Sequence, residues 1–348
     1  MNTQWSREQT SGEQVPSTAH RFRRILGLVA MTLALLLIVS CTAYVAYVHH
    51  SLSGNIRHET MLPNPDDTTG SSGEGHQADG SPGREGTPKT AMDVLLIGSD
   101  RIQTGDVERS DVIMLAHLSG DCKKIYLVHF PRDMYVNIHG VGMARINAAY
   151  ANGGAPLLVE TLEDMLNIHI DHVAAITSDG FIAMTDAVGG VDVYAEEAST
   201  EYEVNIHVGW NHLDGAEASV FVRERHQLTR GDISRGRRQQ SFIRALMLKA
   251  LSKETLMNPV RFAKFVDAVT RNLTVDTGLS VDEIYSEALK LRNIRSGDFV
   301  FVTAPITKYA FTAEGASVAL VDEGRLTSLG DALRNDTMAD YPAGEQIP

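Results

Sequence analysis

The residues with the clearest chemical potential lie in one arginine-rich stretch. Residues 222–240 read VRERHQLTRGDISRGRRQQ and contain six arginines and no lysine. The guanidinium group of arginine presents rigid paired donors that match phosphate oxygens, whereas the ammonium group of lysine is a point charge. The stretch therefore indicates either a phosphate or pyrophosphate site or a solvated, salt-bridged corner of the fold.

The local pattern predicts a strand, a turn and a helix across this stretch. The residues before Arg223 are rich in β-branched and aromatic side chains, which favours a strand. Side chains alternate along a strand, so Arg223 and Arg225 would project from the same face. A turn that carries Asp232 follows. On the helix predicted after it, Arg235 and Gln239 are four residues apart and share a face.

Two aspartates stand at the ends of neighbouring predicted strands. Asp100 closes the first strand, and Asp111, in the sequence Arg109-Ser-Asp, stands just before the second. Carboxylates in such positions could share one hard cation, Mg²⁺ or alternatively Mn²⁺, which prefers oxygen ligands and often bridges to a phosphate. The alternative is that each aspartate caps a turn.

Two further arginines have two interpretations each. Arg132 follows the third predicted strand in Pro131-Arg-Asp, where it is either a ligand contact or the partner of Asp133 in an ion pair. Arg145 is either a ligand contact or surface charge. The sequence contains no Walker loop, no Gly-x-Ser-x-Gly elbow and no Cys/His cluster of the kind that binds zinc.

Composition limits the classes of function. The chain has 348 residues with 31 Lys and Arg against 44 Asp and Glu, a net charge of −13, which argues against a general nucleic-acid role. An arginine cluster on this acidic background therefore needs a local reason, such as an anionic ligand. The two cysteines, Cys41 and Cys122, lie in dissimilar contexts and are not expected to pair.

The N-terminal region predicts a membrane anchor. Residues 1–24 form a polar, disordered tail, and residues 25–48 are uncharged and long enough, at about 36 Å, to cross a bilayer as a signal-anchor helix. The arginines before this run place the N-terminus in the cytoplasm and the rest of the chain outside the cell membrane. Cleavage of the run as a signal peptide and lipidation of Cys41 are the alternatives.

The remaining chain predicts one folded domain. Residues 49–90 are rich in Gly, Ser, Thr and Pro and read as a flexible extracellular linker, and residues 337–348 as a disordered tail. Residues 91–336 alternate strand and helix patterns, which predicts a single α/β domain of three-layer type with a central mixed sheet flanked by helices. Strands are predicted over 93–97, 112–118, 124–130, 134–138, 191–194 and 299–303, and helices over 156–168, 179–188, 233–251 and 325–334.

In order along the chain, nine short motifs resemble the LytR–CpsA–Psr family of cell-wall enzymes. They are 95–100 (LLIGSD), 109–111 (RSD), 131–133 (PRD), 145–150 (RINAAY), 179–181 (DGF), 189–191 (GGV), 213–215 (LDG), 222–226 (VRERH) and 232–240 (DISRGRRQQ). The resemblance implies a Mg²⁺-dependent phosphotransferase. Such enzymes move a glycopolymer from a polyprenyl-pyrophosphate carrier in the membrane onto peptidoglycan, and they form a phosphodiester bond.

The resemblance also implies roles for individual residues. Asp100 and Asp111 would be the metal ligands. The pyrophosphate cradle would comprise Arg132, Arg223, Arg225, Arg235 and the substrate-binding Gln239, with Asp232 in the same catalytic constellation; Arg109 and Arg145 would also bind substrate. Separately from the resemblance, Asp232 is our candidate for the general base. The first motif departs from the family pattern, because the arginine usual two residues after the aspartate is replaced by Ile102. The neighbouring Arg101 directly follows the aspartate and does not fill that position.

Two other functions are compatible with the same residues. A pyrophosphohydrolase would use water where the transferase uses a sugar hydroxyl. A non-catalytic envelope or regulatory protein would bind polyprenyl phosphates without turnover. Product analysis with and without an acceptor separates these possibilities.

Overall fold

The computed structural model describes residues 56–63, 91–100, 109–229, 231–291, 294–313 and 315–342. The polar tail and the membrane span expected over residues 1–48 lie outside these ranges. Within the described ranges, none of the helices combines the length and the apolarity that a bilayer span requires.

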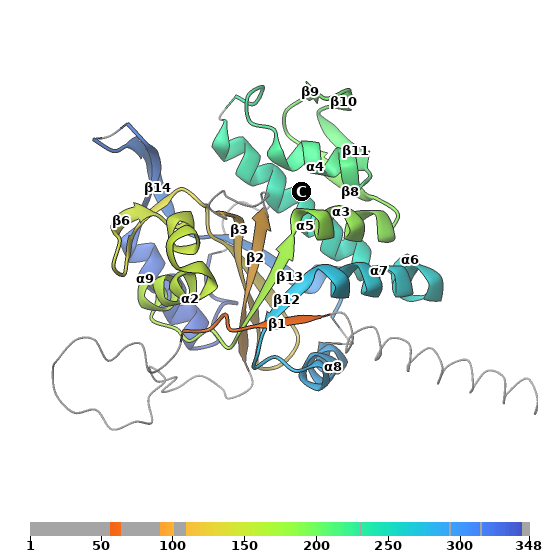
Figure 1. The fold of residues 1–348 in the computed structure, drawn as a ribbon, viewed down its shortest axis with the longest axis horizontal. Helices are drawn as coiled ribbons and strands as arrows, with labels where there is room; N and C mark the ends of the chain where they lie inside the picture. Colours follow the sequence, from red (N-terminus) through yellow and green to blue (C-terminus); the bar gives the residue numbers. More distant parts are fainter. Residues whose placement is uncertain are drawn as a thin grey trace, which may run out of the picture. The chain divides into compact units, whose positions relative to one another are not determined.

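A seven-stranded mixed sheet organises the described chain (Figure 1). Its strands run in the order β1 (Arg57–Glu59), β12 (Leu273–Asp276), β7 (His172–Thr177), β2 (Met92–Asp100), β3 (Arg109–Leu118), β4 (Ile125–His129) and β13 (Phe299–Thr303). The pairs β1/β12, β7/β2 and β4/β13 are parallel and the others antiparallel. The prediction of an α/β fold around a central mixed sheet is confirmed.

Smaller sheets and helices complete the fold. A four-stranded sheet has the order β14 (Ile306–Phe311), β15 (Ser317–Val321), β5 (Met134–Ile138) and β6 (Gly142–Arg145), and two-stranded sheets pair β8 (Val191–Ala195) with β11 (Gly209–Leu213) and β9 (Ser199–Glu201) with β10 (Val204–Ile206). The helices are α2 (Asn147–Leu166), α3 (Ser178–Ala187), α4 (Gly215–Arg223), α5 (Asp232–Ala250), α6 (Lys253–Leu256), α7 (Pro259–Asn272), α8 (Val281–Lys290) and α9 (Glu323–Arg334).

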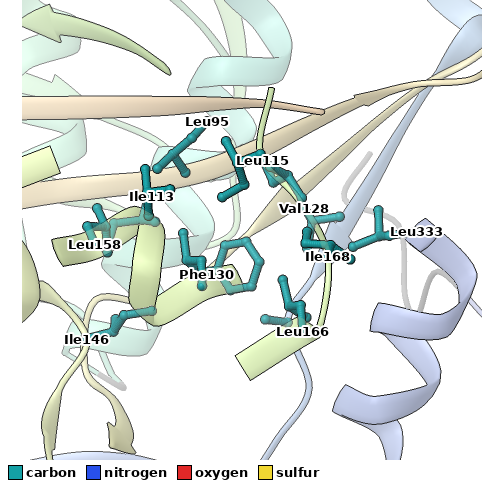
Figure 2. Close-up of a cluster of buried hydrophobic side chains, with 14 of the residues drawn as sticks. Leu95, Ile113, Leu115, Val128, Phe130, Ile146, Leu158, Leu166, Ile168 and Leu333 are labelled. Atoms are coloured by element: carbon teal, nitrogen blue, oxygen red, sulfur yellow. The ribbon is translucent and has the colours of Figure 1, made fainter. Parts of the chain in front are cut away.

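Both faces of the large sheet are covered, which explains the nearly continuous apolar runs in its central strands. Leu95 and Ile113 belong to a core cluster with residues of α2 and α9, as Figure 2 shows for Leu158 and Leu333. The next residues along the strands face the other way. Met114, for example, belongs to a separate cluster that α5 covers through partly buried side chains.

The segment before Arg223 is a helix, so the prediction of a strand there is wrong. Asp214 caps α4 and forms a reciprocal capping box with Glu217, which fixes the helix start. Phe221 is fully buried on the inner face of α4, so the β-branched and aromatic residues serve helix packing. Arg223 therefore lies in the last turn of a helix, and Arg225 follows that helix instead of sharing a strand face with it.

Two differences concern segments expected to lack structure. Arg57–Glu59, inside the predicted linker, forms β1 and pairs with β12, and the flanking Ile56 and Met61 are buried. Near the other end, Met338 is 2% exposed and belongs to the main core cluster. The pairing of β1 with β12 depends on contacts more than 200 residues away, which local composition does not reveal.

Candidate functional site

One edge of the large sheet collects the predicted site residues. The strands β2, β7, β4 and β13 end at this edge, because Ser99 pairs with Thr177 and Thr303 pairs with His129 in parallel register. Strand β3 begins there, since Arg109 pairs with Asp100 at the end of β2. Ligands of α/β proteins commonly bind outside the carboxyl ends of strands, so this edge is the first place to look for a site.

A β-bulge stands where the two predicted metal ligands meet. Gly98 pairs with Val112 but Ser99 pairs with Ser110, so Asp111 is an extra residue in β3. Bulges occur often beside active sites, where they change the direction of a side chain. Asp100 and Asp111 occupy nearly diagonal backbone positions on adjacent strands, a spacing of about 7–8 Å in a regular ladder.

Two aspartates at such positions on adjacent strands fit the chemistry of Mg²⁺, which is commonly held by one or two carboxylates together with water and phosphate oxygens. The described residues contain no group of three or more His, Cys, Asp or Glu arranged to hold a metal. The side chains of Asp100, Arg109, Asp111 and Asp232 lie outside the described part of the structure.

Asp133 brings two of the predicted arginines together. Its carboxylate lies 3.8 Å from Nε of Arg132 and 3.4 Å from Nη1 of Arg145. The turn between β4 and β5 supports this arrangement, because the backbone N–H of Met134 donates to the carbonyl of Pro131 at 2.9 Å. Two guanidinium groups held by one carboxylate leave a net positive charge beside the sheet edge, which would favour an anion.

Side-chain hydrogen bonds attach helix α5 to the same edge of the sheet. The side-chain amide of Gln240 donates to Nδ1 of His129 at 2.9 Å and to the hydroxyl of Thr303 at 2.7 Å. The amide of Gln239 donates to the carbonyl of Val222 at 3.4 Å, which joins α5 to α4. The bonds of Gln240 attach α5 to the ends of β4 and β13, and the buried Arg235 lies five residues earlier on the same helix.

A buried arginine further fixes α5. The guanidinium of Arg238 donates to the carbonyl of Glu197 at 2.7 Å and to the hydroxyl of Ser199 at 3.0 Å, and it stacks 4.7 Å from the ring centre of Phe221. Burial lowers the pKa of Arg238, but an arginine stays charged at any physiological pH. Arg238 therefore acts in positioning, a role that its place in the arginine run does not reveal.

The segment that carries Arg225 is held by two carboxylates. Glu224 is 1% exposed and accepts from the backbone N–H groups of His226 and Gln227 at 2.5 and 3.0 Å. Glu197 accepts from the N–H of Thr229 at 2.6 Å and from the hydroxyl of Ser234, bonds that lower the pKa of Glu197 to about 2. The guanidinium of Arg225 itself is exposed.

A mostly apolar cavity of about 90 Å³ opens between this sheet edge and helices α3, α4 and α5. Its lining includes Gly98 and Val112, which lie close in sequence to the two aspartates, together with Arg223 and Gln239. Val222 and Phe181, among others, supply apolar walls. Two residues predicted to bind a pyrophosphate thus line one cavity with apolar side chains, an arrangement suited to an amphiphilic ligand.

The free energy of unfolding should decrease as the pH falls, because the folded protein keeps the buried His129 unprotonated. Burial lowers the pKa of His129 from 6.5 to about 4, so the unfolded chain binds the extra proton between these values. Stability that is complete above pH 6.5 is therefore lost progressively toward pH 4. We expect this loss to be smaller in His129→Gln, and urea unfolding of both proteins at pH 7, 5 and 4 measures it. An equal loss in both proteins would contradict the assignment.

Residues 58–335 match the model of the LytR_cpsA_psr family. The chain is 32% identical over 279 residues to the cell wall biosynthesis protein LcpA of Corynebacterium glutamicum, covering 67% of this chain and 53% of the relative. It is 33% identical over 250 residues to the polyisoprenyl-teichoic acid–peptidoglycan teichoic acid transferase TagU of Enterococcus faecalis, covering 71% and 80%. The chain thus spans about half the length of LcpA.

Solved structures share the fold. TagV of B. subtilis aligns with a TM-score of 0.61 at 25% identity, covering 74% of this chain and 100% of TagV. A structure of TagT bound to LI-WTA aligns with a TM-score of 0.56 at 25% identity, covering 76% and 95%. The LytR-Csp2A-Psr enzyme of Actinomyces oris aligns at 0.60 with 19% identity, covering 80% and 95%, a similarity of fold alone.

Proposed function

The chain belongs to the LytR_cpsA_psr family, and from that membership we propose that it transfers a glycopolymer from a polyprenyl-pyrophosphate carrier to peptidoglycan. The printed activity of its relative TagU, a polyisoprenyl-teichoic acid–peptidoglycan teichoic acid transferase, supports the reaction class. The single observation that carries the proposal is the cavity beside the β2/β3 bulge, because it joins apolar walls to Arg223 and Gln239.

The cavity offers apolar walls for the polyprenyl chain of the carrier and arginines for its diphosphate. Its apolar walls would cover part of the polyprenyl chain, since removing apolar surface from water contributes roughly 25 cal/mol per Å². The diphosphate would lie toward Arg223 and the arginines of the sheet edge. Guanidinium pairs suit that role because they bind phosphate oxygens through two parallel hydrogen bonds.

Transfer would proceed by in-line displacement at the sugar-linked phosphorus. The acceptor hydroxyl forms a new oxygen–phosphorus bond while the bond to the bridging oxygen breaks, and polyprenyl phosphate leaves with that oxygen. The hydroxyl proton passes to a general base, for which Asp232 is the candidate. Arg132, Arg223, Arg225 and Arg235 would stabilise the charge on the phosphate oxygens, with Arg109, Arg145 and Gln239 positioning the substrate.

Asp100 and Asp111 would hold Mg²⁺, or Mn²⁺ in its place. When bound, such an ion would neutralise charge on the diphosphate and orient it. The backbone pairing supports this, because Asp100 ends β2 opposite the start of β3, two residues before Asp111. We also propose that residues 25–48 anchor the protein in the cell membrane with the catalytic domain outside, on the grounds of the apolar run and its basic N-terminal flank.

Supplying the carrier-linked glycopolymer with and without a peptidoglycan acceptor tests the proposed reaction. We expect a mass-identified phosphodiester product that requires the acceptor and is suppressed by chelation of divalent cations. Release of free glycopolymer phosphate at the same rate in both mixtures would indicate a pyrophosphohydrolase. Binding of the carrier with no covalent product would indicate a non-catalytic binding protein.

Filling the apolar cavity should weaken carrier binding. Ser219 lines the cavity from α4, so the bulky ring of Ser219→Trp would occupy space proposed for the polyprenyl chain. We expect the KM for a long-chain carrier to rise about tenfold, in line with the loss of one or two buried prenyl methylenes and methyls. The KM for a short, water-soluble carrier analogue should change less, and an equal change for both would place the chain elsewhere.

A further inference from the structure

A second cavity, polar and of about 180 Å³, lies at the same sheet edge. Strands β1, β7 and β12 and helices α3 and α7 contribute to its walls. Its lining residues are Arg57, Thr177, Asp179, Arg271, Asn272 and Thr274. None of these residues belongs to the cradle described above.

The register of the strands places this polar cavity next to the proposed reaction centre. Thr177 lines both cavities, and it pairs with Ser99, the residue before Asp100. Farther along the edge, Arg57 on β1 pairs with Thr274 on β12. Thr177, at the end of β7, therefore belongs to both cavities, one strand from that of Asp100 and two from that of Asp111.

The chemistry of the lining favours an anionic, hydroxyl-rich group. Arg57 and Arg271 bring two guanidinium groups to the cavity, whose lining also includes the carboxylate of Asp179. Arg271 also forms an ion pair with Asp267 at 2.8 Å, which orients its side chain from α7 while leaving it 66% exposed. Guanidinium groups bind carboxylate oxygens through charge-assisted hydrogen bonds, so both arginines can contribute donors to an anion in the cavity. Thr and Asn side chains add donors and acceptors for hydroxyl and amide groups.

From these observations we propose that the polar cavity is the acceptor subsite, in which Arg57 and Arg271 bind a carboxylate of the peptidoglycan peptide stem. The inference rests on the proposed transferase function and adds the place of its second substrate. The polyprenyl chain requires apolar walls, which the first cavity supplies. An acidic glycopeptide requires cations and hydrogen-bonding groups, which the second supplies. An acceptor bound there would present a sugar hydroxyl toward the sheet edge at Ser99 and Asp100.

Kinetics of the full-length protein in detergent separate the two substrates. We expect Arg57→Gln and Arg271→Gln each to raise the KM for a soluble disaccharide-peptide acceptor about tenfold, the loss typical of one charge-assisted hydrogen bond. The KM for the carrier should stay within about twofold. The matched control is Arg261→Gln, on the same helix α7 but outside the cavity lining, which should behave as the parent protein.

A binding measurement keeps the inference testable without turnover. Calorimetric titration with the disaccharide-peptide should show binding that is lost in the Arg57→Gln/Arg271→Gln double variant. A disaccharide-peptide with amidated carboxyl groups should bind the parent protein about as weakly as the unmodified disaccharide-peptide binds the double variant. Unchanged acceptor binding in a folded double variant would overturn the subsite while leaving the transferase proposal standing. Acceptor binding without any transfer by the parent protein would instead contradict the transferase function.

Discussion

Arg225→Ala should lower the turnover of glycopolymer transfer by roughly a hundredfold or more while the protein stays folded. The guanidinium of Arg225 is exposed on a segment that Glu224 and Glu197 hold in place, so its removal leaves those contacts intact. Losing one preorganised donor that stabilises transition-state charge costs roughly 3–4 kcal/mol, or 10²–10³ in rate. Single-turnover rates with a saturating carrier measure the loss of transfer, and thermal unfolding shows whether the variant stays folded.

Two further variants make the Arg225 result specific. Arg225→Lys keeps the charge but loses the paired donors, so we expect an intermediate rate. Arg325→Ala removes an exposed arginine on α9, outside the apolar cavity, and should leave the rate unchanged. Full activity in folded Arg225→Ala would remove this residue from the mechanism, and loss of folding would assign it a structural role.

Phe130→Ala should cost roughly 3–5 kcal/mol of the free energy of unfolding, the range for truncating a buried aromatic side chain. Phe130 is fully buried in the main core cluster, between side chains of the sheet and of α2 (Figure 2). It also directly precedes Pro131 and Arg132, so the cavity left behind would loosen the turn that positions Arg132. Urea unfolding should show the loss as a lower midpoint.

The control for Phe130 is another phenylalanine in the opposite environment. Phe311 on β14 is 77% exposed, so Phe311→Ala should change the free energy of unfolding by no more than about 0.5 kcal/mol. A similar loss of the free energy of unfolding in both variants would mean that burial in the core does not determine how much Phe130 stabilises the fold.

The central strands could be predicted well because their apolar runs are short and bounded by turns. The strands expected over 134–138 and 299–303 have the same bounds in the structure, and those expected near residues 93 and 112 are longer than predicted. Strands β1 and β12 could not be predicted in the same way. Each is three or four residues long, and β1 joins the sheet through partners distant in sequence.

Helix α4 shows where composition misleads. Val220, Phe221 and Val222 favour a strand when read alone, but the capping pair Asp214 and Glu217 starts a helix before them. Helix α2 begins at Asn147, whereas the sequence predicted a helix only from Pro156 onward. Gly154 adopts a φ of 66° and kinks the helix just before that proline, so the prediction found only the part after the kink. Local signals compete in both cases, and tertiary packing decides which of them prevails.

Parts of the candidate site were accessible from the sequence and parts were not. Residue types and motif order predicted Arg132, Arg145, Arg223 and Gln239 as neighbours of one ligand. The structure adds the reasons for their placement, since one carboxylate, that of Asp133, holds the first two and one cavity contains the last two. Positioning residues such as Glu197 gave no sequence signal, because their roles depend on hydrogen bonds across 30 or more residues.

Strand β1 has a consequence for proteolysis. Strands β1 and β2 belong to the same sheet, and residues 60–91 connect them along the chain. A single nick there should not release the N-terminal fragment at once. The fragment would stay bound through the three paired residues of β1 and the buried side chains of Ile56 and Met61. Adding a low concentration of denaturant should then release the fragment, because only these few contacts hold it to the sheet.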